Sequence, residues 1–237
     1  MGKERTKKHE NVCFLLSLSI VYLKIYAMKH LFVCLCCFVF LNVYSQMPLK
    51  TWGDQGNGTY VNPILNADYS DPDVIRVGDS YYMVASDFHF LGMQILKSED
   101  MVNWRLIAQL YDKFDFPEWE NNTRYAGGSW APAIRYHDGK FWVFFCTPHE
   151  GLFMANAENP EGPWAPLTHV AKVPKWEDPC PFWDEDGKAY LGRSIHGAGP
   201  IIIHRMSPDG TKLLDEGRTV YTGPVAEGTK IHKRDGY

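Results

Sequence analysis

The sequence predicts an all-β fold of the β-propeller type. Beyond residue 51 it consists of short alternating or aromatic runs broken by Gly, Pro, Asn and Asp, and it lacks long stretches with helical apolar periodicity. One pattern also recurs four times: a small or acidic opening residue, a short strand, a Gly turn and an aromatic-rich return strand. The recurrences lie about 50 to 60 residues apart, a period typical of a four-stranded propeller blade.

The four units differ mainly in the residue that opens them. In order, they read SDPDVIRVGDSYYMVAS, WAPAIRYHDGKFWVFFC, EDPCPFWDEDGKAYL and AEGTKIHKRDGY, and their openers are Asp71, Ala131, Asp178 and Glu227. In the third unit, Asp186-Gly187 is a strong hairpin signal between two strand-like runs. That turn does not account for Asp178, which stands at the mouth of a strand beside a proline that cannot donate to a ladder.

The first 45 residues resemble a targeting segment. Met28 begins a charged tripeptide that precedes LFVCLCCFVFLNV and YSQ, the parts of a secretory signal cleaved after Ser45. We expect translation to start at Met28, and the protein to be exported to the periplasm or secreted with residues 46–237 as a partial propeller domain. A membrane anchor is the alternative, but basic residues interrupt both apolar runs before the length of about 20 residues that a span needs. We therefore expect no stable membrane span in the mature chain.

Charge and cysteine content exclude several function classes. The net charge is −4 with both signs mixed along the chain, so nucleic acid is not expected as a partner. Four of the six cysteines fall in the leader, which leaves Cys146 and Cys180. Two cysteines form neither a disulfide framework nor a metal-ligand pattern. We expect two free thiols, with a single bridge as the alternative outside the cytoplasm.

The openers are the candidate site. The first strand of each propeller blade lines the central channel, so the four openers should meet at one end of it. Three of them are carboxylates: Asp71, Asp178 and Glu227. One acid before a strand is ordinarily a turn cap. Three acids at equivalent positions of a repeat favour a functional cluster.

The loops after the return strands should border the same pocket. These loops span residues 86–93, 147–151 and 193–199, and their candidate contact residues are Phe88, His89, His149, Arg193 and His196. A catalytic metal is not expected, because zinc needs ligands that converge closely and blades around a channel need not supply them. Hydrogen bonding to a substrate is the functional role that we favour, and exposed loop histidines are the structural alternative.

Carboxylates surrounded by aromatic residues in an exported protein indicate glycoside hydrolysis. That reaction needs one carboxylate to activate water and one carboxylic acid to protonate the leaving oxygen. A third carboxylate nearby would raise the pKa of the acid and keep it protonated near neutral pH. The eight Trp, thirteen Tyr and thirteen Phe suit a sheet-rich fold and also suit stacking on sugar rings.

The four units, taken in order from residue 62 to 237, resemble successive motifs of family 43 glycoside hydrolases. The resemblance implies a five-bladed propeller, of which about three blades and the first strand of the fourth are present, and inversion of anomeric configuration. It also implies activity on β-xylosides or α-L-arabinofuranosides, with saccharides from xylan, arabinoxylan or arabinan as partners. The choice between the two sugars stays open.

The same resemblance implies roles for single residues. Asp71 corresponds to the general base, Asp178 to the residue that tunes the pKa of the acid and orients it, and Glu227 to the general acid. For substrate binding it implies that Phe88 stacks on the sugar and Trp130 walls the pocket, and we add His89 and Arg193 as candidate contacts. No cofactor is required, and a complete protein could carry a structural channel ion such as calcium.

Two departures from the family limit this reading. Thr229 stands where many members have Pro, which bears on subfamily and substrate. The sequence ends at Tyr237, one strand into the fourth blade, so we expect a C-terminally truncated and inactive chain. The alternative function is a non-catalytic carbohydrate-binding propeller. A sucrose- or fructan-cleaving propeller is disfavoured because the NDPNG-like context of that group is absent.

Overall fold

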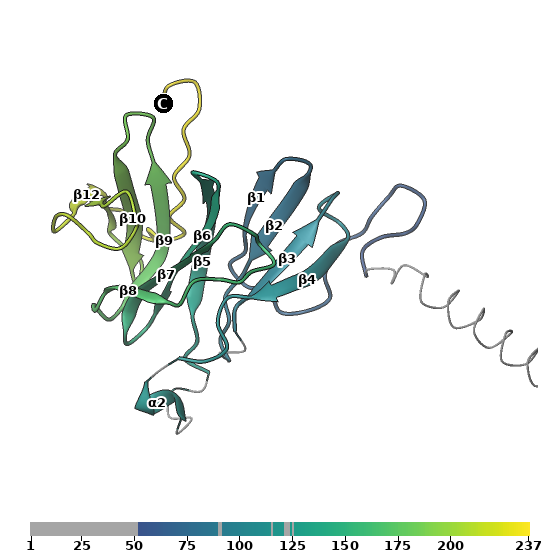
Figure 1. Ribbon diagram of the computed structural model, residues 1–237, viewed down its shortest axis with the longest axis horizontal. Helices are drawn as coiled ribbons and strands as arrows, with labels where there is room; N and C mark the ends of the chain where they lie inside the picture. The colour runs from purple at the N-terminus through teal and green to yellow at the C-terminus, as the bar shows by residue number, and fades with distance from the viewer. Residues whose placement is uncertain (1–51, 90–91, 115, 121–123, 125) are drawn as a thin grey trace, which may run out of the picture. The chain divides into compact units, whose positions relative to one another are not determined.

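The computed structural model describes residues 52–237 except 90–91, 115, 121–123 and 125 (Figure 1). Within that part, twelve strands form three four-stranded antiparallel sheets, which we call the first, second and third blades. The expected leader and its cleavage site lie outside the described residues. Among the helices in the described part, none has the length and apolar character needed to cross a membrane.

Each blade is a meander in which consecutive strands pair. The first blade contains β1 (Asp73–Val77), β2 (Ser80–Val84), β3 (Gln94–Ser98) and β4 (Trp104–Gln109). The second contains β5 (Trp130–His137), β6 (Lys140–Thr147), β7 (Gly151–Ala157) and β8 (Thr168–Ala171). The third contains β9 (Trp176–Trp183), β10 (Ala189–Ile195), β11 (Ile201–Met206) and β12 (Arg218–Tyr221). A short helix, α2 (Pro117–Glu120), lies between the first two blades in the sequence.

The predicted Gly turns join the first two strands of each blade. In the second blade His137 pairs with Lys140, which leaves a two-residue loop of Asp138 and Gly139. Both loop residues have positive φ, 49° and 72°, as a type I′ turn requires. This turn matches the right-handed twist of the flanking strands and therefore sets the register of the hairpin.

The second blade is the middle layer of the described structure, as Figure 1 shows. Neighbouring residues of a strand point to opposite faces, and β6 uses both. Phe145 packs toward Val84 and Ile95 of the first blade, while Phe144 packs toward Leu191 of the third. All of these side chains are almost fully buried. Each such burial contributes about 1.5–3 kcal/mol, so β6 joins the three sheets into one core.

The outer faces of the first and third blades are covered differently. On the first blade Met83, Leu96 and Trp104 pack against the segment that contains Ile64 and Leu65. On the third blade the covering segment is 222–237.

That covering segment approaches the third blade closely. A Cβ at Gly192 would lie 2.8 Å from Thr229 and 2.9 Å from Ile231. The predicted first strand of the fourth unit lies here but is not a strand, because no described segment pairs with its backbone in a ladder.

The two cysteines of the described chain are free and buried, as expected from the sequence. Cys180 Sγ accepts hydrogen bonds from the backbone N–H of Ile231 (3.1 Å) and from Arg135 Nη2 (2.9 Å). Cys146 lies in β6, and burial raises the pKa of its thiol well above the ordinary value. Both thiols therefore serve as packing groups in the folded chain.

Candidate functional site

The openers of the three blades share one backbone conformation. Asp71, Ala131 and Asp178 have φ values of 50°, 33° and 54°, in the left-handed region that non-glycine residues rarely occupy. Such a residue costs on the order of 1–2 kcal/mol in a left-handed conformation. Its recurrence at the same place in three units shows that the units are structurally equivalent.

Two of the three openers are also held by the same hydrogen bond. Asp71 Oδ2 accepts from the hydroxyl of Ser86 at 2.7 Å, and Asp178 Oδ2 accepts from the hydroxyl of Ser194 at 2.8 Å. Each serine stands at or just beyond the end of the return strand of its own blade. Asp178 Oδ2 accepts a further hydrogen bond from the backbone N–H of Gly228 at 2.6 Å. In the first and third blades, the return strand of the same blade thus supplies the hydroxyl that orients the carboxylate.

All four openers meet in one pocket of about 260 Å³. Its lining consists of Asp71, Pro72, Ala131, Asp178, Glu227, Gly228 and Lys230. Asp178 is buried, whereas Asp71 and Glu227 are exposed to solvent. The structure therefore brings together the three acids that the repeat pattern singled out.

A fourth acid, Glu177, was not expected at this site. It is buried, and its carboxylate, with those of Asp178 and Glu227, forms a group whose oxygens lie within 4.8 Å of one another. Burial, and after it the charge of Asp178, raises the pKa of Glu177 above its ordinary value, although His196 opposes the rise. The available signal was an acid directly before an opener, where the first two units have Ser70 and Trp130.

The group of three carboxylates supplies oxygens of the type that Ca²⁺ and Mg²⁺ prefer. Three protein ligands are fewer than the six to eight oxygens that Ca²⁺ takes. One oxygen of Asp178 is already engaged by Ser194 and Gly228. Among the described residues, no candidate metal cluster includes a histidine. The channel ion therefore stays a prediction.

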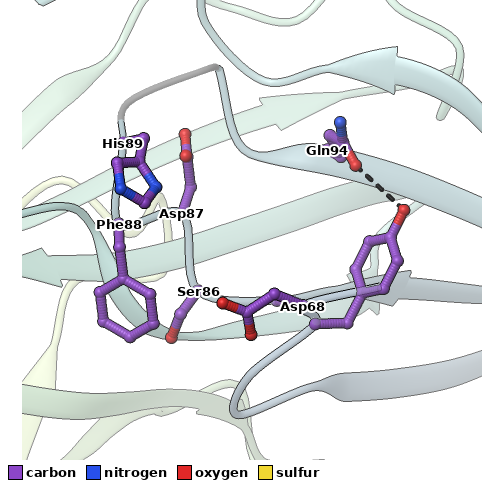
Figure 2. Close-up of a pocket in the computed structure, with 8 residues that line it drawn as sticks. Asp68, Ser86, Asp87, Phe88, His89 and Gln94 are labelled. Atoms are coloured by element: carbon purple, nitrogen blue, oxygen red, sulfur yellow. Dashed lines mark hydrogen bonds between the residues drawn. The ribbon is translucent and has the colours of Figure 1, made fainter. Parts of the chain in front are cut away.

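A second pocket, of about 190 Å³, adjoins the first. Figure 2 shows its lining, which includes Asp68, Tyr69, Ser86, Asp87, Phe88, His89 and Gln94. The expected sugar contacts Phe88 and His89 both lie here. Ser86 connects the two pockets, since it lines this one and donates to Asp71 in the other. The hydroxyl of Tyr69 donates to Gln94 at 3.2 Å, the dashed line in Figure 2.

The loop that carries Phe88 is held rigidly at its base. Asp87 exchanges backbone hydrogen bonds of 2.9 Å with Ser129, and its carboxylate accepts from the backbone N–H of Gly92 and Met93. Gly128 has φ of 73°, and a Cβ there would lie 2.3 Å from Phe88 Cα. A glycine is therefore required for the second blade to approach this loop.

Trp130 and Arg193 occupy different environments. The indole N–H of Trp130 donates to Gly127 O at 2.6 Å, and its ring lies 5.1 Å from the imidazole of His196. Arg193 belongs to β10, not to the loop after it, and neither pocket includes it. Its guanidinium lies 3.6 Å from the centre of the Trp176 ring, and burial lowers its pKa to about 10.

The placement of Arg193 corrects the sequence-based expectation. A register shift in the pairing of β9 with β10 lies between Gly192 and Ser194, where the loop was expected to begin. The strand therefore continues to Ile195 and keeps Arg193 inside the sheet. There its Nε donates to His204 Nε2 at 3.0 Å. The structure thus gives Arg193 protein partners in the core of the blade.

Antiparallel four-stranded meanders are the blades of a propeller, and three carboxylates that meet in one pocket are the groups that glycoside hydrolysis uses. Residues 60–237 match the profile of Glycosyl hydrolases family 43, and the chain belongs to this family. Solved relatives of the family are five-bladed propellers, which confirms the predicted fold class with three blades in the described part.

Individual relatives add detail. A protein of Xylanibacter ruminicola assigned as a beta-xylosidase is 66% identical over 194 residues, which are 82% of this chain and 36% of that protein. A non-reducing end alpha-L-arabinofuranosidase of Bacteroides ovatus is 32% identical, over 76% of this chain and 35% of its own length. The solved structure of a bifunctional GH43-CE protein from Bacteroides eggerthii is similar with a TM-score of 0.66 and 30% identity, covering 74% of this chain and 24% of that one. The chain thus spans about a third of the length of the curated relatives.

Proposed function

We propose that this chain is part of an inverting glycoside hydrolase that acts on xylose- or arabinofuranose-containing saccharides of plant cell walls. The observation that carries the proposal is the pocket in which Asp71, Asp178 and Glu227 meet, in a chain of family 43. The names of the relatives support both sugars, since one is assigned as a beta-xylosidase and another is an alpha-L-arabinofuranosidase.

In the proposed reaction Asp71 acts as general base. It takes a proton from a water molecule whose oxygen bonds to the anomeric carbon. The bond from that carbon to the leaving oxygen breaks, and Glu227 donates its proton to that oxygen. Inverting enzymes need room for the water between the two carboxyl groups. Asp71 shares the pocket but stands outside the close group formed by Glu177, Asp178 and Glu227, which is consistent with such a gap.

Asp178 would act on Glu227 through its charge. It is buried, and its Oδ2 accepts two hydrogen bonds, from the hydroxyl of Ser194 and the backbone N–H of Gly228. Carboxylate oxygens of Asp178 and Glu227 lie within 4.8 Å of each other, and a negative charge that close disfavours a second ionised carboxylate. Gly228 directly follows Glu227, so the same hydrogen bond also positions the acid.

The adjoining pocket would hold the sugar ring. Phe88 supplies an aromatic face for stacking, and Asp68, His89 and Gln94 supply hydrogen-bonding groups around it. Asp68 is exposed, and in Figure 2 its carboxylate lies beside Ser86, the residue that reaches Asp71. A ring seated there would have its anomeric carbon near the proposed base. In this proposal Trp130 forms one wall of the sugar site. Arg193 lies within β10 and lines neither pocket.

Turnover of nitrophenyl β-xyloside and nitrophenyl α-L-arabinofuranoside tests the proposal. The chain should be assayed alone and fused to the remaining part of the Xylanibacter ruminicola relative, so that the product has the length of that relative. Proton NMR of the first product formed should show the inverted anomer. Saccharide binding without hydrolysis by the fused protein would instead support the carbohydrate-binding alternative.

We propose further that the protein is exported after cleavage near Ser45. The support is the arrangement of charged, apolar and small residues from Met28 onward. N-terminal sequencing of the exported protein should begin at Gln46. Protein with an intact Met1 in the membrane fraction would contradict export.

A further inference from the structure

We propose that Glu177 is a positioning residue of the acid-lined pocket, which sets the pH range over which Glu227 holds its proton. This inference rests on the proposed function, in which Glu227 is the general acid. Neither the repeat pattern nor the family resemblance pointed to Glu177.

The side chain of Glu177 does not point where a regular strand would place it. Glu177 and Asp178 are neighbours in β9 and should point to opposite faces of the sheet. Both are nevertheless buried, and their carboxylate oxygens lie within 4.8 Å of each other. The left-handed φ of Asp178 and the register shift opposite it, between Gly192 and Ser194, re-aim the two side chains. The third blade thus departs from a regular strand to bring a second acid to this place.

Glu177 and Asp178 share one hydroxyl donor, that of Ser194. The hydroxyl of Ser194 lies 2.8 Å from Asp178 Oδ2 and 3.5 Å from Glu177 Oε1. One hydroxyl proton cannot serve two carboxylates fully, and the shorter contact goes to Asp178. Glu177 is therefore the less well stabilised of the two anions.

Titratable groups face Glu177 from each neighbouring element. Asp178 from β9 and Glu227 from segment 222–237 are both acids, and the thiol of Cys146 in β6 senses Glu177 as well. The basic side chain paired with Glu177 is His196, whose Nδ1 lies 3.3 Å from Glu177 Oε2.

Two other basic side chains in this part of the structure have partners outside the group of three carboxylates. Lys230 donates to Pro132 O at 3.2 Å, and Arg193 stacks on Trp176. His196 is the basic side chain that pairs directly with Glu177, and its own side chain is 57% exposed. Interacting carboxylates of this kind titrate as a set, so the charge on one sets the proton affinity of the others.

His196 also connects the acids to the expected sugar wall. Its ring lies 5.1 Å from that of Trp130 at an interplanar angle of 38°. Trp130 and His196 are 5.1 Å apart between ring centres, His196 pairs with Glu177 at 3.3 Å, and carboxylate oxygens of Glu177 and Glu227 lie within 4.8 Å of each other. A change in the protonation of Glu177 is thus positioned to reach both.

Carboxyl ¹³C NMR of the 237-residue chain, labelled at Glu Cδ, tests the proposal without any need for activity. Glu177→Gln should remove one resonance, which identifies it, and that resonance should titrate above the ordinary Glu value of 4.5. Glu227→Gln should lower its midpoint because a negative neighbour is lost, and His196→Gln should raise it because the opposing cation is lost.

Glu158→Gln is the matched control. Glu158 is exposed and lies just beyond β7 in the second blade, so its loss should leave the Glu177 midpoint unchanged. A Glu177 resonance that titrates at the ordinary value, or that ignores Glu227→Gln, would overturn the proposal. Glu227 is itself exposed, so its replacement should leave the fold intact.

The fused protein supplies the functional readout. Glu177→Gln should move the falling limb of the kcat/KM pH profile to lower pH, because ionised Glu227 then has one negative neighbour fewer. KM and the rate on the plateau should change less than twofold. A purely structural Glu177 would instead lower kcat at every pH without moving the limb. If the unsubstituted fusion is inactive, the proposed function fails while the NMR titration still decides the role of Glu177.

Discussion

The first and third blades share the same backbone geometry at their opening residues but differ in the charge around them. In both, the opening aspartate has a left-handed φ and accepts a hydrogen bond from a serine of the return strand. Asp71 is exposed and follows Ser70, whereas Asp178 is buried and follows Glu177. The repeat thus conserves backbone geometry between blades while each position varies in burial and charge.

A second pair of positions shows the same contrast two residues further on. Asp73 in the first blade accepts the backbone N–H of Ile134 at 2.8 Å, and Cys180 in the third accepts that of Ile231 at 3.1 Å. Each is a contact from one unit to the next. Arg135 of the second blade reaches both acceptors, through an ion pair with Asp73 and a hydrogen bond to Cys180. One guanidinium therefore connects the inner strands of all three blades.

Asp71 and Asp178 are therefore equivalent in position but need not have equivalent roles. An exposed carboxylate can take a proton from water, whereas a buried one with two fixed donors is better suited to hold a constant charge. The following predictions test this difference, and they use the fused protein wherever turnover is measured.

Loss of the exposed acids should have the largest effect. Asp71→Ala and Glu227→Ala should each reduce turnover by about 10²–10⁴-fold, the range of general acid–base catalysis. Substrates with very good leaving groups need little protonation, so they should rescue Glu227→Ala more than Asp71→Ala. Steady-state kinetics on two aryl xylosides measures this, and equal rescue of both variants would reverse the assignment.

Removal of the shared guanidinium should be the largest effect on stability. Arg135→Ala leaves Asp73 buried without its cation, and breaking a buried pair from one side costs about 3–5 kcal/mol. Arg76→Ala is the control, since its pair with Asp79 is exposed and contributes about 0–1 kcal/mol. Urea unfolding of the chain measures both. A cost for Arg135→Ala no greater than that of the control would remove its linking role.

Loss of the serine hydroxyl should destabilise the third blade more than the first. Ser194→Ala deprives buried Asp178 of a donor and should cost about 1–3 kcal/mol, the desolvation penalty of an unsatisfied buried group. Ser86→Ala removes a donor to exposed Asp71, which water can replace, and an acceptor for the backbone N–H of Ala131, so it should cost about 1 kcal/mol. Thermal unfolding of the two variants provides the test, and equal losses would mean that burial does not distinguish the blades.

Glu177 should make stability depend on pH in one direction. Its pKa is raised in the folded chain, so its contribution is present below the ordinary Glu value and is lost as pH rises through the raised value. Glu177→Gln should therefore raise the urea midpoint at pH 8 and leave it little changed at pH 4. A variant that loses stability equally at both pH values would show that the carboxylate is held as an anion.

The pattern of openers and turns was sufficient to predict three units, their hairpins and the meeting of Asp71, Asp178 and Glu227. It was sufficient because these depend on local signals, Asp-Gly turns and alternating runs, that repeat at one period. The position of β6 between the two other sheets was not predicted, although it has a local cause. Its apolar run FWVFFC includes adjacent Phe144 and Phe145, and neighbouring residues of a strand must face two different sheets.

What the sequence by itself determined is therefore the repeat, the order of strands and the three acids at its openers. Only the tertiary structure decided where Glu177 and Arg193 point, because both depend on the register shift between β9 and β10. It also decided that Arg135 joins Asp73 to Cys180, residues 107 positions apart in the chain. A register shift and a three-strand contact arise from how separate segments pair and pack, and no local run of residues contains that information.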